Sequence, residues 1–324
     1  MAAQSFTMRD GERTIRFGEG SAAEAPDLLR QAGFDGYTLL TTERAAGSAP
    51  LEPAARLDVP PGLVDEISAA LLPDAGDQPL VALGGGRVID TAKAIGGVTG
   101  APLAAIPTTL SGAELTPFHR LPAGVDGARM VRPSLVIADP RLMASQPEPQ
   151  LWASAMNALA HGMEALYTPL ANPVAERAAL RGAEAIFAED IALGAFLCGW
   201  ASGMTGFAVH HATCQVLVRT AGSPHAQTNA VMLPHFAGMM SGRVPGVMAE
   251  FARALGDGEA DPDAAAGRAA KLSARSGHTR LATLGVEGEQ LPQAAAAVMQ
   301  HPALGNTPDP PGEDELLALL RDAL

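Results

Sequence analysis

The chain has 324 residues, of which 47% are hydrophobic and 18% are charged. This length is enough for one large domain or two ordinary domains with a sizeable core. Lys and Arg number 22 against 35 Asp and Glu, a formal net charge of −13. Such an acidic balance argues against nucleic acid or an anionic membrane as the main partner.

The two cysteines, Cys198 and Cys214, are too few for a disulfide framework and suit a reducing compartment. The first twenty residues lack the apolar core of a signal peptide. No stretch approaches the roughly 18 apolar residues of a membrane span. We therefore expect a cytoplasmic protein that binds a small-molecule substrate and neither a membrane nor nucleic acid.

Short apolar runs alternate with helical patterns in the first half of the chain. The patterns predict helices over 22–32 and 88–95, and strands over 14–17, 37–41, 80–83, 103–106 and 134–138. Strands that alternate with helices favour parallel pairing in an α/β domain. We expect a mostly parallel, Rossmann-like sheet over residues 1–147.

The second half is Ala-rich, has few β-branched runs, and is typical of an all-helical domain over residues 148–324. The segment 141–149 is predicted as a linker between the two domains. Helices are predicted over 152–167, 173–187, 191–218, 226–240, 244–255 and 263–284.

The strongest local motif is LVALGGGRVIDTAKAIG, in which a predicted strand ends at Gly84, Gly85 and Gly86 and a helix follows. Backbone N–H groups at such a turn can approach a pyrophosphate closely. The motif is not GxGxxG, and a glycine triplet can also be an ordinary tight turn. Asp90 and Lys93 lie on the helix that follows.

A second motif, IPTTLSGAELTP, places Thr108, Thr109 and Ser111 after the predicted strand 103–106. Ligands bind at the carboxyl ends of the strands in open α/β sheets. A loop rich in turn-forming residues is the alternative interpretation.

A third group of residues is rich in histidine. Asn157 and His161 are four residues apart on one predicted helix and so share a face, and His211 and His225 follow in later helices. One oxygen donor and three histidines can surround a divalent ion. Each histidine can equally be a packed, hydrogen-bonded core residue.

Five motifs together resemble the iron-containing alcohol dehydrogenase superfamily, most closely its maleylacetate reductase branch. They span about residues 13–255 and read GGGRVIDTAK, AIPTTLSGAELTP, MNALAHGMEALY, FLCGWASGMTGFAVHHATCQVL and SPHAQTNAVMLPH. The resemblance implies a dehydroquinate synthase-like architecture, with an NAD(P)H-binding domain, an all-helical domain, and an active site in the cleft between them. It also implies a homodimer.

The resemblance assigns roles to the residues singled out above. Asn157, His161, His211 and His225 occupy the metal positions, and the last three are the catalytic candidates. The pyrophosphate maps to Gly84, Gly85 and Gly86, with Asp90 and Lys93 nearby, and the nicotinamide side to Thr108, Thr109 and Ser111.

Departures from the family pattern cluster at these positions. Asn157 stands where the family has a metal-binding Asp, and an amide binds Fe²⁺ or Zn²⁺ weakly, so we expect no catalytic metal. Gln215 replaces a histidine that can relay protons, and Gln227 and Asn229 replace two further ionisable groups. Arg87 replaces the serine after the glycine triplet, where it can bind a phosphate or fill the space that the pyrophosphate needs.

Three functional hypotheses follow. The first is an NAD(P)H-dependent reductase of an enone or carbonyl substrate, in which His225 and His161 donate hydrogen bonds and protons and His211 supports them. The second is a non-redox lyase, cyclase or isomerase that uses the same histidines, and the third is a catalytically dead homologue. Cations for an anionic substrate could come from Arg87, Arg120 and Arg219.

The cofactor preference stays open. Glu43 can accept a hydrogen bond from a ribose 2′-hydroxyl, which favours NAD. Arg44, its neighbour, can bind the 2′-phosphate of NADP.

Overall fold

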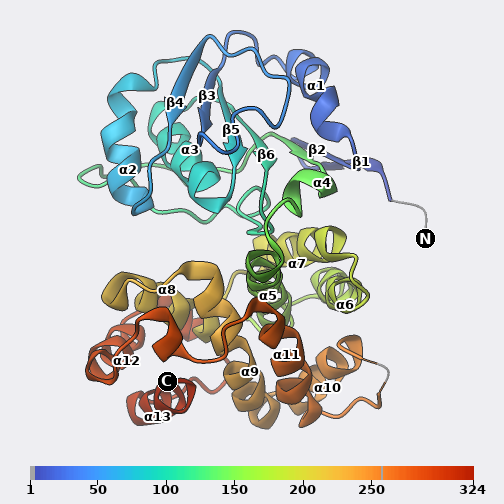
Figure 1. The fold of residues 1–324 in the computed structure, drawn as a ribbon, viewed down its shortest axis with the longest axis vertical. Coiled ribbons are helices and arrows are strands. Elements are labelled where there is room, and N and C mark those ends of the chain that lie inside the picture. The colour runs from blue at the N-terminus through green and yellow to red at the C-terminus, as the bar shows by residue number, and fades with distance from the viewer. Residues whose placement is uncertain (1–3, 257) are drawn as a thin grey trace. The chain divides into compact units, whose positions relative to one another are not determined.

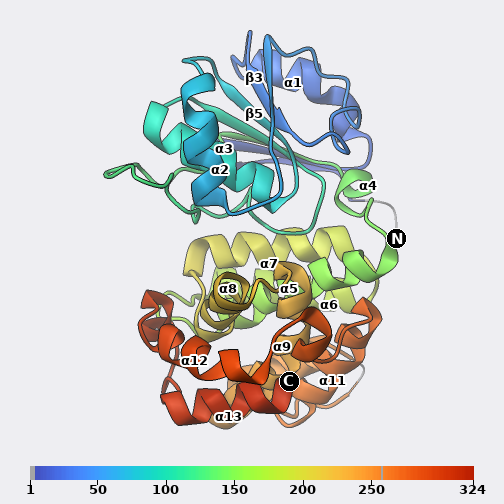
Figure 2. The same cartoon turned by 60° about the vertical axis from the view of Figure 1, so that its left-hand side comes forward.

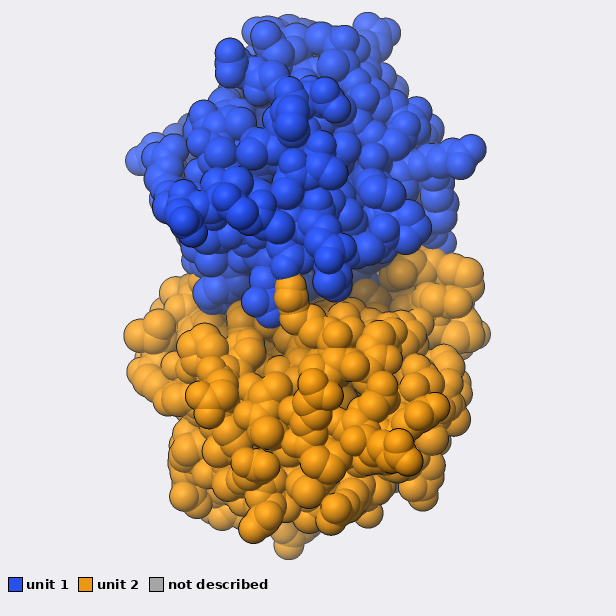
Figure 3. Space-filling model, turned by 90° about the vertical axis from the view of Figure 1, so that its left-hand side faces the viewer, with its two compact units in different colours: residues 1–145 blue, residues 146–324 orange. Residues whose placement is uncertain are grey.

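The structure is a computed structural model that describes residues 4–256 and 258–324. The chain forms two compact units, Met1–Ser145 and Gln146–Leu324 (Figure 3). Residues 1–3, which belong to the N-terminal segment predicted to lack a signal peptide, lie outside the described residues.

The first unit contains a seven-stranded sheet in the order β1-β2-β7-β6-β5-β3-β4 (Figure 1). Only the β1–β2 pair is antiparallel, and every other pairing is parallel. The predicted mostly parallel α/β fold is therefore confirmed. The strands are β1 (Phe6–Asp10), β2 (Arg13–Phe17), β3 (Thr38–Thr41), β4 (Ala55–Asp58), β5 (Leu80–Gly84), β6 (Leu103–Pro107) and β7 (Leu135–Ala138).

Helices cover both faces of this sheet because successive strand residues point to opposite sides. Val81 and Leu83 of β5 pack on the face covered by α1 (Ala25–Gln31). Leu80 and Ala82 pack on the other face, against α2 (Val64–Leu71) and α3 (Gly86–Thr99). The central strands are thus apolar on both sides, as parallel sheets require.

The second unit is helical, as predicted. Helix α5 contacts α6, α7, α8 and α9 (Figure 2). The helices are α5 (Glu148–Ala165), α6 (Pro173–Phe187), α7 (Ile191–Thr205), α8 (Val209–Ala221), α9 (His225–Arg243), α10 (Pro245–Ala254), α11 (Ala264–Ser273), α12 (Leu291–Met299) and α13 (Glu313–Ala323).

Two predicted helices are wrong in extent. The single helix expected over 191–218 is two helices, because Gly206 has a φ of 80° and a ψ of −169°, which only glycine adopts readily. The helix expected over 263–284 ends at Ser273, and short 3-10 turns follow it. The predicted linker 141–149 contains the end of α4 (Pro140–Met143) and the start of α5.

Within the described part of the chain, no single helix has the length and apolar character to cross a membrane. Helices α7 and α8 pass that test only as a pair, and they bend by 99° at their break.

Candidate functional site

The glycine turn joins β5 to α3 in the first unit. Gly85 is the N-cap of α3, and no side chain among the described residues caps that end of the helix. The first N–H groups of α3 are therefore available to an anion. A Cβ on Gly85 would lie 2.9 Å from Thr109 Cγ2, and one on Gly86 would lie 3.0 Å from Ser111 Oγ. The predicted Thr-Thr loop thus packs against the turn, so the glycines are required by the fold as well as by any phosphate.

Lys93 anchors that loop from α3. Its ammonium group is fully buried and donates to Asp90 Oδ1 at 2.8 Å, to the Ala113 carbonyl at 3.0 Å and to the Phe118 carbonyl at 2.6 Å. Because an ammonium group has three N–H donors, all of them are used inside the protein. Lys93 therefore positions the loop, and its predicted place in the cofactor site stays a prediction.

The same loop contains a buried carboxyl group that the motif analysis did not single out. Arg13 Nη2 donates to the Glu114 carbonyl at 2.7 Å, while the Glu114 side chain is 1% exposed. Burial raises the pKa of Glu114 to about 7, and the nearby Lys93 and Arg13 limit the increase. Glu114 is therefore about half protonated in the folded protein at neutral pH and mostly protonated below it.

The predicted residues Glu43 and Arg87 line a pocket at the carboxyl ends of β3 and β4. The pocket has a volume of about 670 Å³ and is confined to the first unit. Arg87 is exposed, and Gly85 and Gly86 beside it are half-exposed. The glycine turn thus remains partly open to solvent.

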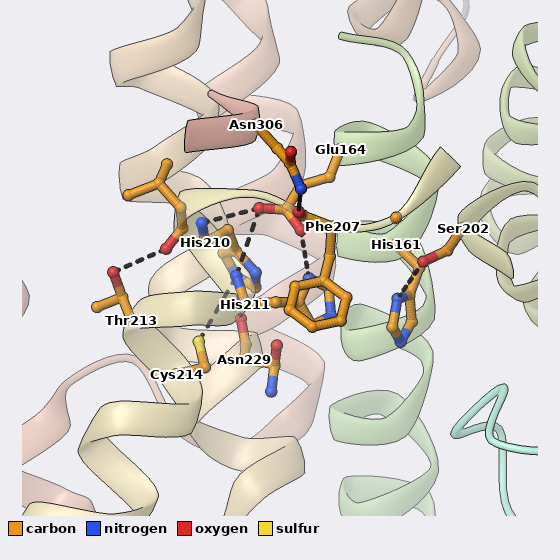
Figure 4. A network of polar contacts seen from close by, with 12 residues as sticks. His161, Glu164, Ser202, Phe207, His210, His211, Thr213, Cys214, Asn229 and Asn306 are labelled. Carbon is orange, nitrogen blue, oxygen red and sulfur yellow. Dashed lines mark hydrogen bonds and ion pairs between the residues drawn. The ribbon is translucent and has the colours of Figure 1, made fainter. Parts of the chain in front are cut away.

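The histidines come from the second unit (Figure 4). His161 on α5 and His211 on α8 stack with ring centroids 4.1 Å apart and planes inclined by 23°. His161 Nδ1 lies 3.1 Å from Ser202 Oγ of α7. Asn157 Oδ1 and His211 Nε2 are buried and have no hydrogen-bond partner among the described residues. Buried polar atoms of this kind are satisfied by a water molecule, an ion or a ligand.

Glu164 is a buried carboxyl group beside the histidines that the sequence analysis did not single out. Its Oε1 accepts from the His210 backbone N–H at 2.8 Å, and its Oε2 lies 2.6 Å from His211 Nδ1. Burial raises the pKa of Glu164 and lowers the pKa of His211 to about 3. Glu164 thus satisfies the amino end of α8 and fixes the His211 ring. Its signal was present in the sequence, since positions 157, 161 and 164 share one helix face.

The remaining predicted residues are placed as follows. His225 is the first residue of α9 and is exposed, and its carbonyl accepts from Asn229 Nδ2 at 2.8 Å. Gln215 and Gln227 are half-buried on α8 and α9. Arg120 lies in the first unit, and Arg219 lies in the last turn of α8.

The predicted metal ligands are one amide and three imidazole groups. His161 and His211 stack on each other. Among the described residues, the carboxylate and imidazole groups that lie close enough together for a shared ion are those of Glu164, His210 and His211. Glu164 is already hydrogen-bonded in that cluster. The metal role of Asn157, His161, His211 and His225 stays a prediction.

Comparison with known proteins gives the family. The model of the iron-containing alcohol dehydrogenase matches residues 16–147, and that of the C-terminal part of the Fe-containing alcohol dehydrogenase family matches residues 152–324. A maleylacetate reductase of Sphingobium indicum is 32% identical over an alignment that covers 96% of this chain and 95% of that protein.

Solved structures agree with the sequence relatives. The maleylacetate reductase of Agrobacterium tumefaciens has a TM-score of 0.84 at 29% identity, covering 99% of this chain and 98% of that one. The maleylacetate reductase of a Rhizobium species has a TM-score of 0.83 at 30% identity over the same shares. The chain therefore belongs to the iron-containing alcohol dehydrogenase family and, within it, to the maleylacetate reductase branch.

Proposed function

We propose that this chain is an NAD(P)H-dependent reductase that reduces an alkene conjugated to a ketone, as in maleylacetate. Relatives named maleylacetate reductase match almost its full length. The observation that carries the proposal is His211 Nε2, which is buried, has no partner among the described residues, and belongs to a ring held by Glu164.

The first unit supplies the cofactor site. The uncapped N–H groups of α3 at Gly85 and Gly86 suit the pyrophosphate, and Thr109 and Ser111 support the turn. When bound, the nicotinamide supplies a hydride to the substrate. Arg87 lines a neighbouring pocket and the glycine turn is partly open to solvent, which supports binding of the pyrophosphate there.

The second unit supplies the hydrogen-bond donor. Burial raises the pKa of Glu164, although the backbone N–H groups that it accepts from lower it, and burial lowers the pKa of His211 to about 3. In our proposal the pair is neutral: the Glu164 hydroxyl donates to His211 Nδ1 and the ring proton stays on Nε2. The Nε2–H then stabilises negative charge as it develops on the enolate oxygen of the substrate. Protonation of the substrate carbon falls to His161 or His225.

We also propose that the reaction proceeds without a metal. Asn157 supplies no charge, and its amide oxygen is a weaker ligand for Fe²⁺ or Zn²⁺ than the carboxylate that the family pattern has at this position. Chelator-treated protein, with metal content checked by mass spectrometry, should oxidise NAD(P)H with maleylacetate at the rate of untreated protein. Loss of activity that is restored by Fe²⁺ or Zn²⁺ would contradict the metal-free reaction, whereas no turnover in any sample would contradict the reductase function itself.

A further inference from the structure

The pocket at the carboxyl ends of β3 and β4 is lined by charged side chains, which pyrophosphate binding by the backbone of the glycine turn does not require. It is lined by Thr42, Glu43, Arg44, Arg56, Asp58, Val59, Pro60, Pro61 and Arg87. Three of these residues are arginines and two are acidic, so the lining carries a small positive charge in a protein with a net charge of −13.

The three arginines are not equivalent. Arg56 is paired with Asp58, with its Nε 3.0 Å from Asp58 Oδ1. Arg44 and Arg87 are exposed, and neither is hydrogen-bonded or ion-paired within residues 4–256 and 258–324. Two unpaired guanidinium groups in one pocket make an anion site, because guanidinium binds phosphate oxygens in a bidentate manner.

The position of the pocket in the sheet, beside the glycine turn, indicates which anion it binds. β3 pairs directly with β5, the strand that ends at the glycine turn. In dinucleotide-binding sheets, the residues after the strand next to the glycine turn meet the adenosine ribose. Arg44 follows β3 closely, and Arg87 lies in the first turn of α3. Both side chains line the pocket.

We infer that Arg44 and Arg87 bind the 2′-phosphate of NADPH and make the protein prefer NADPH over NADH. The inference rests on the proposed function, because it concerns the cofactor of the same reaction. Glu43 lines the same pocket and can accept from the ribose 3′-hydroxyl. In this assignment, Arg87 binds a phosphate monoester at the position where the family pattern has a serine next to the pyrophosphate.

The test is calorimetric titration of the full chain with NADPH, NADH, adenosine 2′,5′-bisphosphate and ADP. We expect NADPH to bind at least about tenfold more tightly than NADH, as charge-assisted hydrogen bonds to a phosphate require. The 2′,5′-bisphosphate should exceed ADP by a similar factor. Equal or tighter binding of NADH overturns the inference and leaves the reductase proposal in place, whereas binding of neither dinucleotide overturns both.

Variants show whether these arginines bind the 2′-phosphate or the pyrophosphate. Arg44→Ser and Arg87→Ser should each weaken NADPH binding severalfold while NADH binding changes far less. If Arg87→Ser weakens NADPH and NADH binding alike, Arg87 contacts the pyrophosphate and its assignment is wrong. Arg9→Ser is the matched control: it removes the same charge from exposed β1, at the opposite edge of the sheet, and should leave both affinities unchanged.

Discussion

At the scale of single residues, the protonation of Glu164 decides what His211 can do. A neutral carboxyl donates to His211 Nδ1 and leaves a proton on Nε2, whereas a carboxylate would accept from Nδ1 and leave Nε2 bare. The 2.6 Å contact between Oε2 and Nδ1 suits either direction. Burial of both groups favours the neutral pair, and this choice has a direct experimental consequence.

Glu164→Gln should keep kcat close to that of the wild type. The Gln oxygen can accept from the His210 backbone N–H while its NH₂ donates to His211 Nδ1, which reproduces the neutral carboxyl. Glu164→Leu removes both contacts and should lower kcat by about 10²-fold, the usual effect of losing one donor to an oxyanion. Ring ¹⁵N NMR of His211 should report a proton on Nε2 in the wild type and in Glu164→Gln. A bare Nε2 in the wild type, with Glu164→Gln inactive, would show that Glu164 is ionised.

Glu114 predicts a pH dependence of stability in the first unit. Its pKa is about 7 in the folded protein and near 4.5 when unfolded, so between these values only the folded state keeps the proton. The free energy of unfolding then falls as pH rises through this window, by on the order of 2 to 3 kcal/mol, and the cost persists above it.

Glu114→Gln should remove that cost, so the variant gains stability over the wild type as pH rises from 4.5 to 7. Urea unfolding at several pH values measures the difference in unfolding free energy between the variant and the wild type. Burial lowers the pKa values of His210 and His211 to about 3, which has the opposite effect on stability. Because both proteins contain these histidines, their contribution cancels in the difference. Glu12→Gln, in an exposed turn, is the control. Parallel curves for Glu114→Gln and wild type would contradict the buried, proton-retaining carboxyl.

At the scale of elements, the hairpin of α6 and α7 depends on glycine. A Cβ on Gly194 would lie 2.6 Å from the Gly182 carbonyl oxygen and 2.8 Å from the Ile186 nitrogen. Backbone atoms cannot move aside as a flexible side chain can, so the two helices approach closely only through these glycines.

Gly194→Ala should therefore destabilise the protein by about 1–3 kcal/mol, the range typical of overpacking. Gly267→Ala is the matched control in α11, where an added Cβ meets nothing within 4 Å. That change should stabilise by about 0.5–1 kcal/mol, because Ala is the better helix former. Thermal unfolding measures both, and two shifts of the same sign would contradict the close-packed hairpin.

Secondary structure followed from the sequence wherever the periodicity was strong. Helix α6 was predicted with its exact bounds because Pro173 opens it after the Asn172 cap. The break at Gly206 was missed because apolar residues continue on both sides of it, and a φ of 80° cannot be inferred from composition. β1 and β4 were missed because none of their residues is buried, so they lack the apolar run that predicts a strand.

At the scale of the whole molecule, local motifs predicted candidate site residues but not the contacts that hold them. The glycine turn, the Thr-Thr loop and the histidines are candidates from the sequence alone. Their partners are not, because Lys93 meets carbonyls 20 and 25 residues away and His211 meets Glu164 across 47 residues. Such contacts depend on the tertiary fold, which local patterns do not encode. The expected homodimer and the cytoplasmic location stay predictions.

The central claim is hydride transfer from a nicotinamide to the substrate, and isotope labelling tests it most directly. Untreated and metal-depleted protein are incubated in separate samples with maleylacetate and either NADPH or NADH that carries deuterium at the transferable position of C4. Mass spectrometry should find one deuterium at carbon in the reduced keto diacid and an equal amount of the oxidised cofactor. Folded samples none of which forms NADP⁺ or NAD⁺, or that change the substrate without incorporating deuterium, would contradict the reductase and favour acid–base chemistry at the histidines.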